Sequence, residues 1–176
     1  MLAGYSVFLK KVSDQNDLVI NTHISTRNAE GSSEIIGWLI GKLISRVEVV
    51  NDDSFKDLLE SCKIVMAEGM EHIQYDFPWK HFDEKQSMGL NLLNNFNTVE
   101  DKAPNFKSHH YNNVDNYLDF TFDMQVLKNG IWILCKYKND LVDKSEISEV
   151  CDEFVEVIKT AINTPDIKMK YWSKIE

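Results

Sequence analysis

The stretch YLDFTFDMQVLKNGIWILCKYK, residues 117–138, decides the fold class of this chain. In its first half apolar and polar side chains alternate, which is the pattern of a strand that buries one face. Asn129-Gly130 then provides a dipeptide well suited to a two-residue hairpin turn, and IWILCKYK forms the returning strand. The stretch therefore predicts an antiparallel hairpin, with its inward-facing residues being Leu118, Phe120, Phe122, Met124 and Val126.

The remainder of the chain interleaves predicted strands with predicted amphipathic helices. Strands are expected at residues 17–26, in the second half of 35–50 and at 88–97, and helices at 1–15, 51–74 and 144–162. The second helix is expected to begin after Ser54, whose side chain caps it together with Asp57 three residues later. The third helix places on one face Ile147, Val150, Cys151, Phe154, Ile158 and Ile162. This order predicts a single α/β domain over residues 1–176, with helices packed on a mixed sheet.

The balance of charge argues against several classes of partner. The 176 residues contain 19 Lys+Arg and 28 Asp+Glu, which gives a net charge of −9. Phosphate backbones and anionic lipid surfaces repel such a chain, so we expect neither nucleic-acid nor membrane binding. No apolar run is long enough to span a bilayer. No GxGxxG or GxxxxGK[ST] motif indicates a nucleotide site.

The cysteines indicate the redox compartment. Cys62, Cys135 and Cys151 are odd in number and form no CxxC pair. Two of them fall on apolar faces of predicted elements. Free thiols in a reducing cytoplasm explain this usage better than a disulfide framework or a zinc site. We therefore expect a cytoplasmic protein.

Four stretches, in order along the chain, resemble those of one enzyme family. They are LAGYSVFLKKVSDQNDLVINTHISTRN (2–28), IGWLIGKLISR (36–46), IQYDFPWKHF (73–82) and the hairpin with the helix after it (117–162). The second is similar to the motif I/V-G-x-F-V-N-T-x-x-x-R, and the third to H/N-Q-D-x-P-F-E. Together they resemble the C-terminal lobe of the condensation domain of nonribosomal peptide synthetases, which has the chloramphenicol acetyltransferase-like fold.

This resemblance assigns expected roles to eight residues. It implies that the floor of the family's substrate tunnel is formed here by Gly37, Trp38, Gly41 and Lys42. It implies structural roles for Arg27, Arg46, Asp76 and Pro78. The family's Asn-Thr pair is replaced by Gly41-Lys42, so the original chemistry of that segment is not carried over. The family uses no bound cofactor, and its substrates arrive on the phosphopantetheine of a carrier protein.

The adjacent pair His109-His110 invites comparison with the family's catalytic motif, HHxxxDG. That motif would require aspartate at position 114 and glycine at 115, but the sequence has Val114 and Asp115. The pair also lies in the polar segment 97–116, where the resemblance places a crossover loop, whereas the family carries HHxxxDG on its N-terminal lobe. We therefore expect solvated loop histidines and no catalytic residue in this chain. Contact with a partner is the lesser alternative.

Other candidate ligands are scattered. His72, Asp76 and His81 flank a predicted helix end and could in principle converge on a metal ion. Structural roles explain them better, because a zinc site needs close-packed His, Cys or carboxylate ligands. His23 is expected on the polar side of its strand. No GxSxG elbow marks a nucleophile.

Three functions remain open. The first is a truncated condensation-like domain of a nonribosomal peptide or polyketide synthetase. It would be non-catalytic by itself and would contact a carrier protein or an adjacent domain. The second is the C-terminal half of an active condensation domain, which forms amide bonds with the catalytic histidine on a missing N-terminal lobe. The third is an acyltransferase whose site forms between subunits. Because a missing lobe would leave apolar surface uncovered, a homodimer is also expected.

Overall fold

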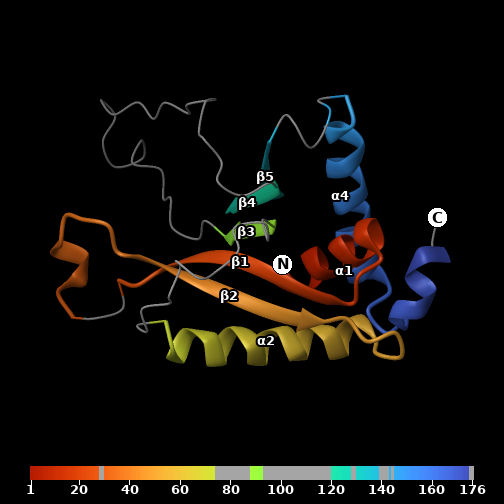
Figure 1. Cartoon of the computed structure of the whole chain (residues 1–176), viewed down its shortest axis with the longest axis horizontal. Coiled ribbons are helices and arrows are strands. Elements are labelled where there is room, and N and C mark those ends of the chain that lie inside the picture. The colour runs from red at the N-terminus through yellow and green to blue at the C-terminus, as the bar shows by residue number, and fades with distance from the viewer. Residues whose placement is uncertain are drawn as a thin grey trace.

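The computed structural model describes residues 1–27, 30–73, 88–92, 120–127, 130–138, 143 and 145–174. Five strands form one sheet in the order β2-β1-β3-β4-β5 (Figure 1). They are β1 (Asp17–Ser25), β2 (Ile40–Glu48), β3 (Met88–Leu92), β4 (Phe120–Leu127) and β5 (Gly130–Tyr137). The β1–β2 and β4–β5 pairs are antiparallel, whereas β3 runs parallel to both of its neighbours. The predicted mixed sheet and its closing hairpin are confirmed.

The described helices all pack on one face of this sheet. They are α1 (Leu2–Ser13), α2 (Phe55–Glu71) and α4 (Ile147–Asn163), with short 3-10 turns η1 (Ser32–Glu34) and η3 (Met169–Lys174). α2 lies along β2, and α1 lies between β1 and α4 (Figure 1). None of the described helices is both long and apolar enough to cross a membrane.

The start of α2 follows from a local signal in the sequence. Ser54 accepts a hydrogen bond from the backbone N–H of Asp57 through its Oγ, at 3.3 Å. The Asp57 carboxylate accepts one in return from the backbone N–H of Ser54, at 2.9 Å. This reciprocal capping box satisfies two backbone donors that the first turn of a helix leaves unpaired. The predicted cap is confirmed.

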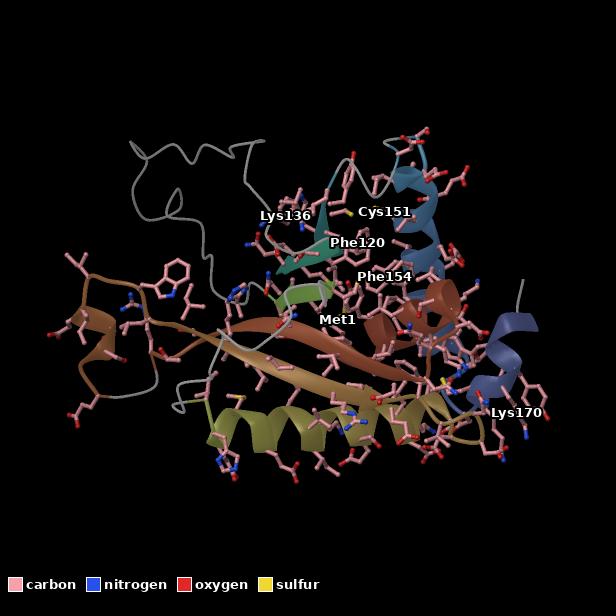
Figure 2. The ribbon with its side chains drawn as sticks, in the orientation of Figure 1. Met1, Phe120, Lys136, Cys151, Phe154 and Lys170 are labelled. Carbon is pink, nitrogen blue, oxygen red and sulfur yellow. The ribbon has the colours of Figure 1, made fainter. Side chains whose placement is uncertain are left out.

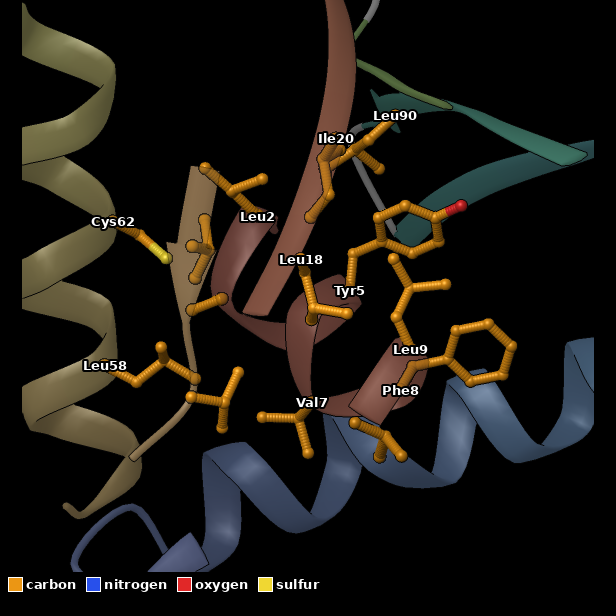
Figure 3. Packing of buried hydrophobic residues seen from close by; sticks show 14 of the residues in the cluster. Leu2, Tyr5, Val7, Phe8, Leu9, Leu18, Ile20, Leu58, Cys62 and Leu90 are labelled. Carbon is orange, nitrogen blue, oxygen red and sulfur yellow. The ribbon is translucent and has the colours of Figure 1, made fainter. Parts of the chain in front are cut away.

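A cluster of aromatic side chains joins α1 and α4 to the sheet. Phe154 of α4 lies 4.6 Å from Phe122 of β4 and 5.5 Å from Phe8 of α1, measured between ring centroids. Tyr5 and Phe120 complete the cluster. Figure 3 shows how α1 places Tyr5 and Phe8 at the centre of the packed residues, while α2 contributes its own side chains from the other side. The core therefore lies between the sheet and its helices.

The structure corrects two of the residues predicted to face inward. Ile162 is 73% exposed, although it lies on the same helix as the buried Phe154 and Ala161. Ile162 is the second-last residue of α4, so it lies past the point where Phe154 packs on the sheet. Val126 is 61% exposed, and its cross-strand partner Ile131 is exposed as well. The turn end of the hairpin therefore extends beyond the helix layer.

Candidate functional site

Polar side chains gather on the face of the sheet opposite α1, α2 and α4, which we call the second face. Side chains alternate between the two faces of a strand. Because Phe122 of β4 points into the aromatic core, its neighbour Asp123 must point to the second face. The same alternation places His23 of β1, Asn91 of β3 and Lys136 of β5 there. Figure 2 shows Lys136 on the side of the strands away from α4, and Phe154 between the strands and α4.

These four residues form one continuous chain of contacts, the His23–Lys136 network. The Oδ1 atom of Asn91 lies 2.9 Å from the backbone nitrogen of His23 and 3.0 Å from its ring Nδ1. The Asn91 Nδ2 group donates to Oδ1 of Asp123 at 2.7 Å. The other carboxylate oxygen of Asp123 forms an ion pair with Lys136 Nζ. The network thus links four strands, β1, β3, β4 and β5.

Burial affects the charged and titratable side chains of this network. The Asp123 side chain is 8% exposed and that of Lys136 is 32% exposed. A carboxylate is rarely buried to this extent unless it is paired and hydrogen-bonded, as Asp123 is. Burial lowers the pKa of His23 from its usual 6.5, opposed by the Asn91 hydrogen bond and by Asp123 and aided by Lys42 and Lys136. The imidazole is therefore neutral at pH 7.

Thr121 lies beside the network, and its hydroxyl group is buried. Its side chain is on the second face, opposite Lys136 in the β4–β5 hairpin. It is 2% exposed, and its Oγ1 has no hydrogen-bond partner among the described residues. Buried hydroxyl groups are usually paired, because leaving them unpaired costs about 1–3 kcal/mol.

Arg27 organises the loop that joins β1 to β2. Its guanidinium donates through Nη1 to the carbonyl oxygens of Ser32, at 2.7 Å, and Ile35, at 2.8 Å. It also donates through Nη2 to the carbonyl oxygen of Gly37, at 3.0 Å. The planar guanidinium presents its donors in a fixed arrangement, which suits it to fixing several carbonyl groups at once. The residue assigned a structural role by resemblance thus shapes residues 32–37.

The four residues expected to form a tunnel floor lie in different surroundings. Gly37 and Trp38 belong to the β1–β2 loop, which projects from the end of the sheet (Figure 1), and Trp38 is 80% exposed. Gly41 and Lys42 begin β2, where Lys42 is the cross-strand partner of His23. The structure therefore brings only Lys42 of the four close to the His23–Lys136 network.

Gly41 permits a close approach between β2 and the residues that follow α2. A Cβ atom at this position would lie 2.8 Å from Cγ1 of Ile73 and 3.1 Å from Cγ2 of Thr26. Contacts that close require a neighbour to move. The lack of a side chain at Gly41 therefore lets Ile73 pack directly on β2.

The other predicted residues take no part in the network. Arg46 donates through Nε, at 2.9 Å, and Nη2, at 2.7 Å, to the Asp17 carboxylate, and these hydrogen bonds lower the pKa of Asp17. His72 is the exposed residue that ends α2. No three His, Cys, Asp or Glu side chains gather to hold a metal ion within the parts of the chain that the structure describes. Outside those parts lie Asp76, Pro78, His81, His109, His110 and the predicted crossover loop 97–116.

Sequence patterns alone did not predict a role for Asn91, Thr121, Asp123 or Lys136. One signal was available: Asp123 interrupts an otherwise aromatic and aliphatic strand, FTFDM. An acidic residue at the centre of such a strand needs a partner, and Lys136 lies on the returning strand. The contribution of Asn91 carried no comparable signal.

The sequence and the fold of this chain are similar to those of known proteins. The family model described as "Condensation domain" matches residues 1–174. Gramicidin S synthase 2 of Brevibacillus brevis is 24% identical over 180 residues, which cover 95% of this chain and 4% of that protein. A four-domain nonribosomal peptide synthetase, holo-AB3403, superimposes with a TM-score of 0.81 at 16% identity, over 96% of this chain and 15% of the other.

A third relative was solved together with another protein. The X-domain from teicoplanin biosynthesis, in its complex with OxyB, superimposes with a TM-score of 0.78 at 18% identity. That match covers 96% of this chain and 40% of the X-domain chain. The solved structures confirm the predicted chloramphenicol acetyltransferase-like α/β fold. They also show that this chain spans well under half the length of its relatives.

Proposed function

Because the chain belongs to the condensation-domain family of the nonribosomal peptide synthetases, we propose that it serves as one lobe of such a domain. In this proposal it corresponds to the C-terminal lobe and works in the cytoplasm by contacting a carrier protein or a neighbouring synthetase domain. It does not form amide bonds by itself, because the sequence has no HHxxxDG motif.

The observation that carries this proposal is the second face. It bears the His23–Lys136 network and the unpaired hydroxyl of Thr121, while the described helices all pack on the opposite face. The exposed Lys42 and the partly exposed Lys136 present positive charge at the surface of this face, which suits it to recognising another molecule. The X-domain solved with OxyB supports the proposal by analogy, since that protein shares the fold and its structure was solved in a complex.

Binding and catalysis can be tested in one preparation. The purified chain is titrated with aminoacylated carrier proteins and with the domains encoded beside it, and the same mixtures are analysed for amide products by mass spectrometry. We expect binding to one of them and no product. Lys42→Glu, which reverses an exposed charge on the second face, should weaken binding, whereas Lys63→Glu on α2 should not. A chain that binds none of these partners would refute the proposal.

A second candidate function is one half of an active condensation domain. It is favoured by Lys42, whose exposed side chain lies next to His23 on the second face, where a complementary lobe could contact it. A histidine on that lobe would deprotonate or position the amine that attacks a carrier-bound thioester, and this chain would supply a wall of the tunnel. Adding a separately expressed lobe that carries HHxxxDG distinguishes the two functions. Amide product that forms only when both polypeptides are present would establish the second.

Self-association is a separate expectation. If a second copy covers the apolar surface that a partner lobe would contact, the purified chain sediments as a dimer. Sedimentation velocity of the chain alone measures this directly. A monomer that binds no apolar dye would contradict the expectation.

A further inference from the structure

Two cysteine side chains, Cys135 of β5 and Cys151 of α4, meet between the sheet and its helix layer. Cys135 is the cross-strand partner of Phe122, whose ring packs on Phe154 of α4, so it points to the same face of the sheet. Cys151 precedes Phe154 by about one helical turn and lies on the side of α4 that faces the strands (Figure 2). The pair of thiols therefore lies beside the pair of aromatic rings, in the same layer.

The two thiols are hydrogen-bonded to each other, and that bond distinguishes them. Burial is the main reason that the pKa of Cys135 is raised to about 12, and the hydrogen bond adds to the effect. Burial also raises the pKa of Cys151, but there the hydrogen bond from Cys135 acts in the opposite direction. Both groups are therefore protonated at pH 7, and Cys151 is the one whose thiolate has a donor beside it.

Exposure separates this pair from the third cysteine of the chain. Cys135 and Cys151 are only partly buried, so a small reagent can approach them from solvent. Cys62 is 3% exposed and lies on α2 (Figure 3), where its thiol is hydrogen-bonded to Ser6 of α1. Cys62 therefore provides an internal reference for any reaction of the pair.

We propose that Cys135 and Cys151 form a reversible disulfide by exchange with a low-molecular-weight disulfide, for which glutathione disulfide is the probe. The Cys151 thiolate attacks one sulfur of glutathione disulfide, which breaks that S–S bond, forms a mixed disulfide and releases one glutathione thiolate. The Cys135 thiolate then attacks the Cys151 sulfur and releases the second glutathione. The protons lost by the two cysteines pass to the two released thiolates, so the chain loses two electrons and glutathione disulfide gains them.

The disulfide would fasten α4 to β5. In a reducing compartment the pair remains as thiols, and the bond forms when the proportion of glutathione disulfide rises. The bond closes a loop of roughly 15 residues, which restricts the unfolded chain and should raise the melting temperature by about 6–12 °C. The pair then acts as a redox-sensitive lock on the helix layer, whichever molecule contacts the second face.

Mass spectrometry of the whole folded chain tests the exchange. The reduced chain is incubated with glutathione disulfide, quenched with acid, and treated with an alkylating reagent after denaturation. We expect the mass to fall by two hydrogen atoms, Cys62 to be the thiol that is alkylated, and proteolysis to yield a peptide pair that joins Cys135 to Cys151. Dithiothreitol should reverse the change. A bond that includes Cys62, two glutathione adducts on one chain, or no reaction overturns the proposal.

Single substitutions test the order of attack and the fit of the bond. Cys135→Ser should stop at the mixed disulfide and carry one glutathione on Cys151, and Cys151→Ser should react more slowly because burial raises the pKa of Cys135 to about 12. Cys62→Ser is the matched control and should form the bond as the wild type does, with the same rise in melting temperature. Alanine replaces serine in any variant that does not fold. Equal or faster reaction of Cys151→Ser overturns the order of attack, and an oxidised wild type that melts no higher than the reduced chain overturns the lock.

Discussion

Replacing Phe154 by alanine tests whether the aromatic cluster holds the sheet to its helices. Phe154 is fully buried, and its ring lies 4.6 Å from Phe122, 5.5 Å from Phe8 and 6.1 Å from Tyr5. It is thus the point at which α4, α1 and β4 meet. Removing the ring would leave a cavity that three elements border, and none of them can move inward without losing its own contacts.

The expected loss of stability follows from this burial. Phe→Ala substitutions in cores cost about 3–5 kcal/mol, since the lost transfer free energy is increased by the cavity. Each kcal/mol lowers the melting temperature of a chain of this size by about 2–4 °C. Phe154→Ala should therefore lower the melting temperature by about 6–20 °C.

Urea unfolding followed by circular dichroism measures the free energy, and a thermal scan measures the melting temperature. Ile162→Ala is the matched control, because Ile162 lies on the same helix and is 73% exposed. That control should change the free energy of unfolding by no more than about 0.5 kcal/mol. If Phe154→Ala costs less than about 1 kcal/mol, or no more than the control, then α4 does not pack on the sheet as described.

Three further predictions concern local features. Ser54→Ala should lower the free energy of unfolding by about 1 kcal/mol through loss of the helix cap, measured by urea unfolding, whereas Ser61→Ala in the same helix should have little effect. Arg27→Ala should speed amide hydrogen exchange in residues 32–37 without lowering the melting temperature. Arg27→Lys should not restore protection, because one ammonium group cannot replace the fork; full protection in either variant would contradict the loop's dependence on Arg27. Because the pKa of His23 is lowered in the folded chain, the unfolded chain binds its proton first as the pH falls below 6.5. The wild type should therefore lose more stability than His23→Gln between pH 7.5 and 5.5, and equal losses would contradict the shift.

The features that the sequence predicted correctly are those encoded by neighbouring residues. Alternation along Phe120–Leu127 is complete within one strand, and the Ser54–Asp57 cap lies within one helical turn. Both signals are local, so neither depends on where the rest of the chain lies. The two errors fall at the ends of elements. Ile162 and Val126 continue the apolar pattern past the point where the opposing layer stops, and an apolar pattern contains no information about that point.

The His23–Lys136 network could not be predicted in this way, because its four members come from separate strands. His23 and Asn91 are 68 residues apart, and Asn91 and Asp123 are 32 residues apart. Their contact depends on β3 lying parallel between β1 and β4, and on the register of both pairings. Alternation predicts which face each side chain occupies, but only the pairing of the strands determines which side chains meet.

The aromatic core nevertheless determines the geometry of this network. Phe122 and Asp123 are adjacent on β4 and point to opposite faces, so the position of one determines that of the other. A register slip of one residue would move the carboxylate of Asp123 among aromatic rings and Phe122 to the second face. The cost of burying an unpaired charge forbids this slip. Packing between Phe122 and Phe154 on one side therefore holds the register that brings Asn91 to Asp123 on the other. It follows that Phe154→Ala, although it touches no polar residue of the second face, should loosen the hydrogen bond from the backbone N–H of His23 to Asn91. Amide hydrogen exchange at His23 should then be faster in the folded variant than in Ile162→Ala, and equal rates would contradict this link between the two faces.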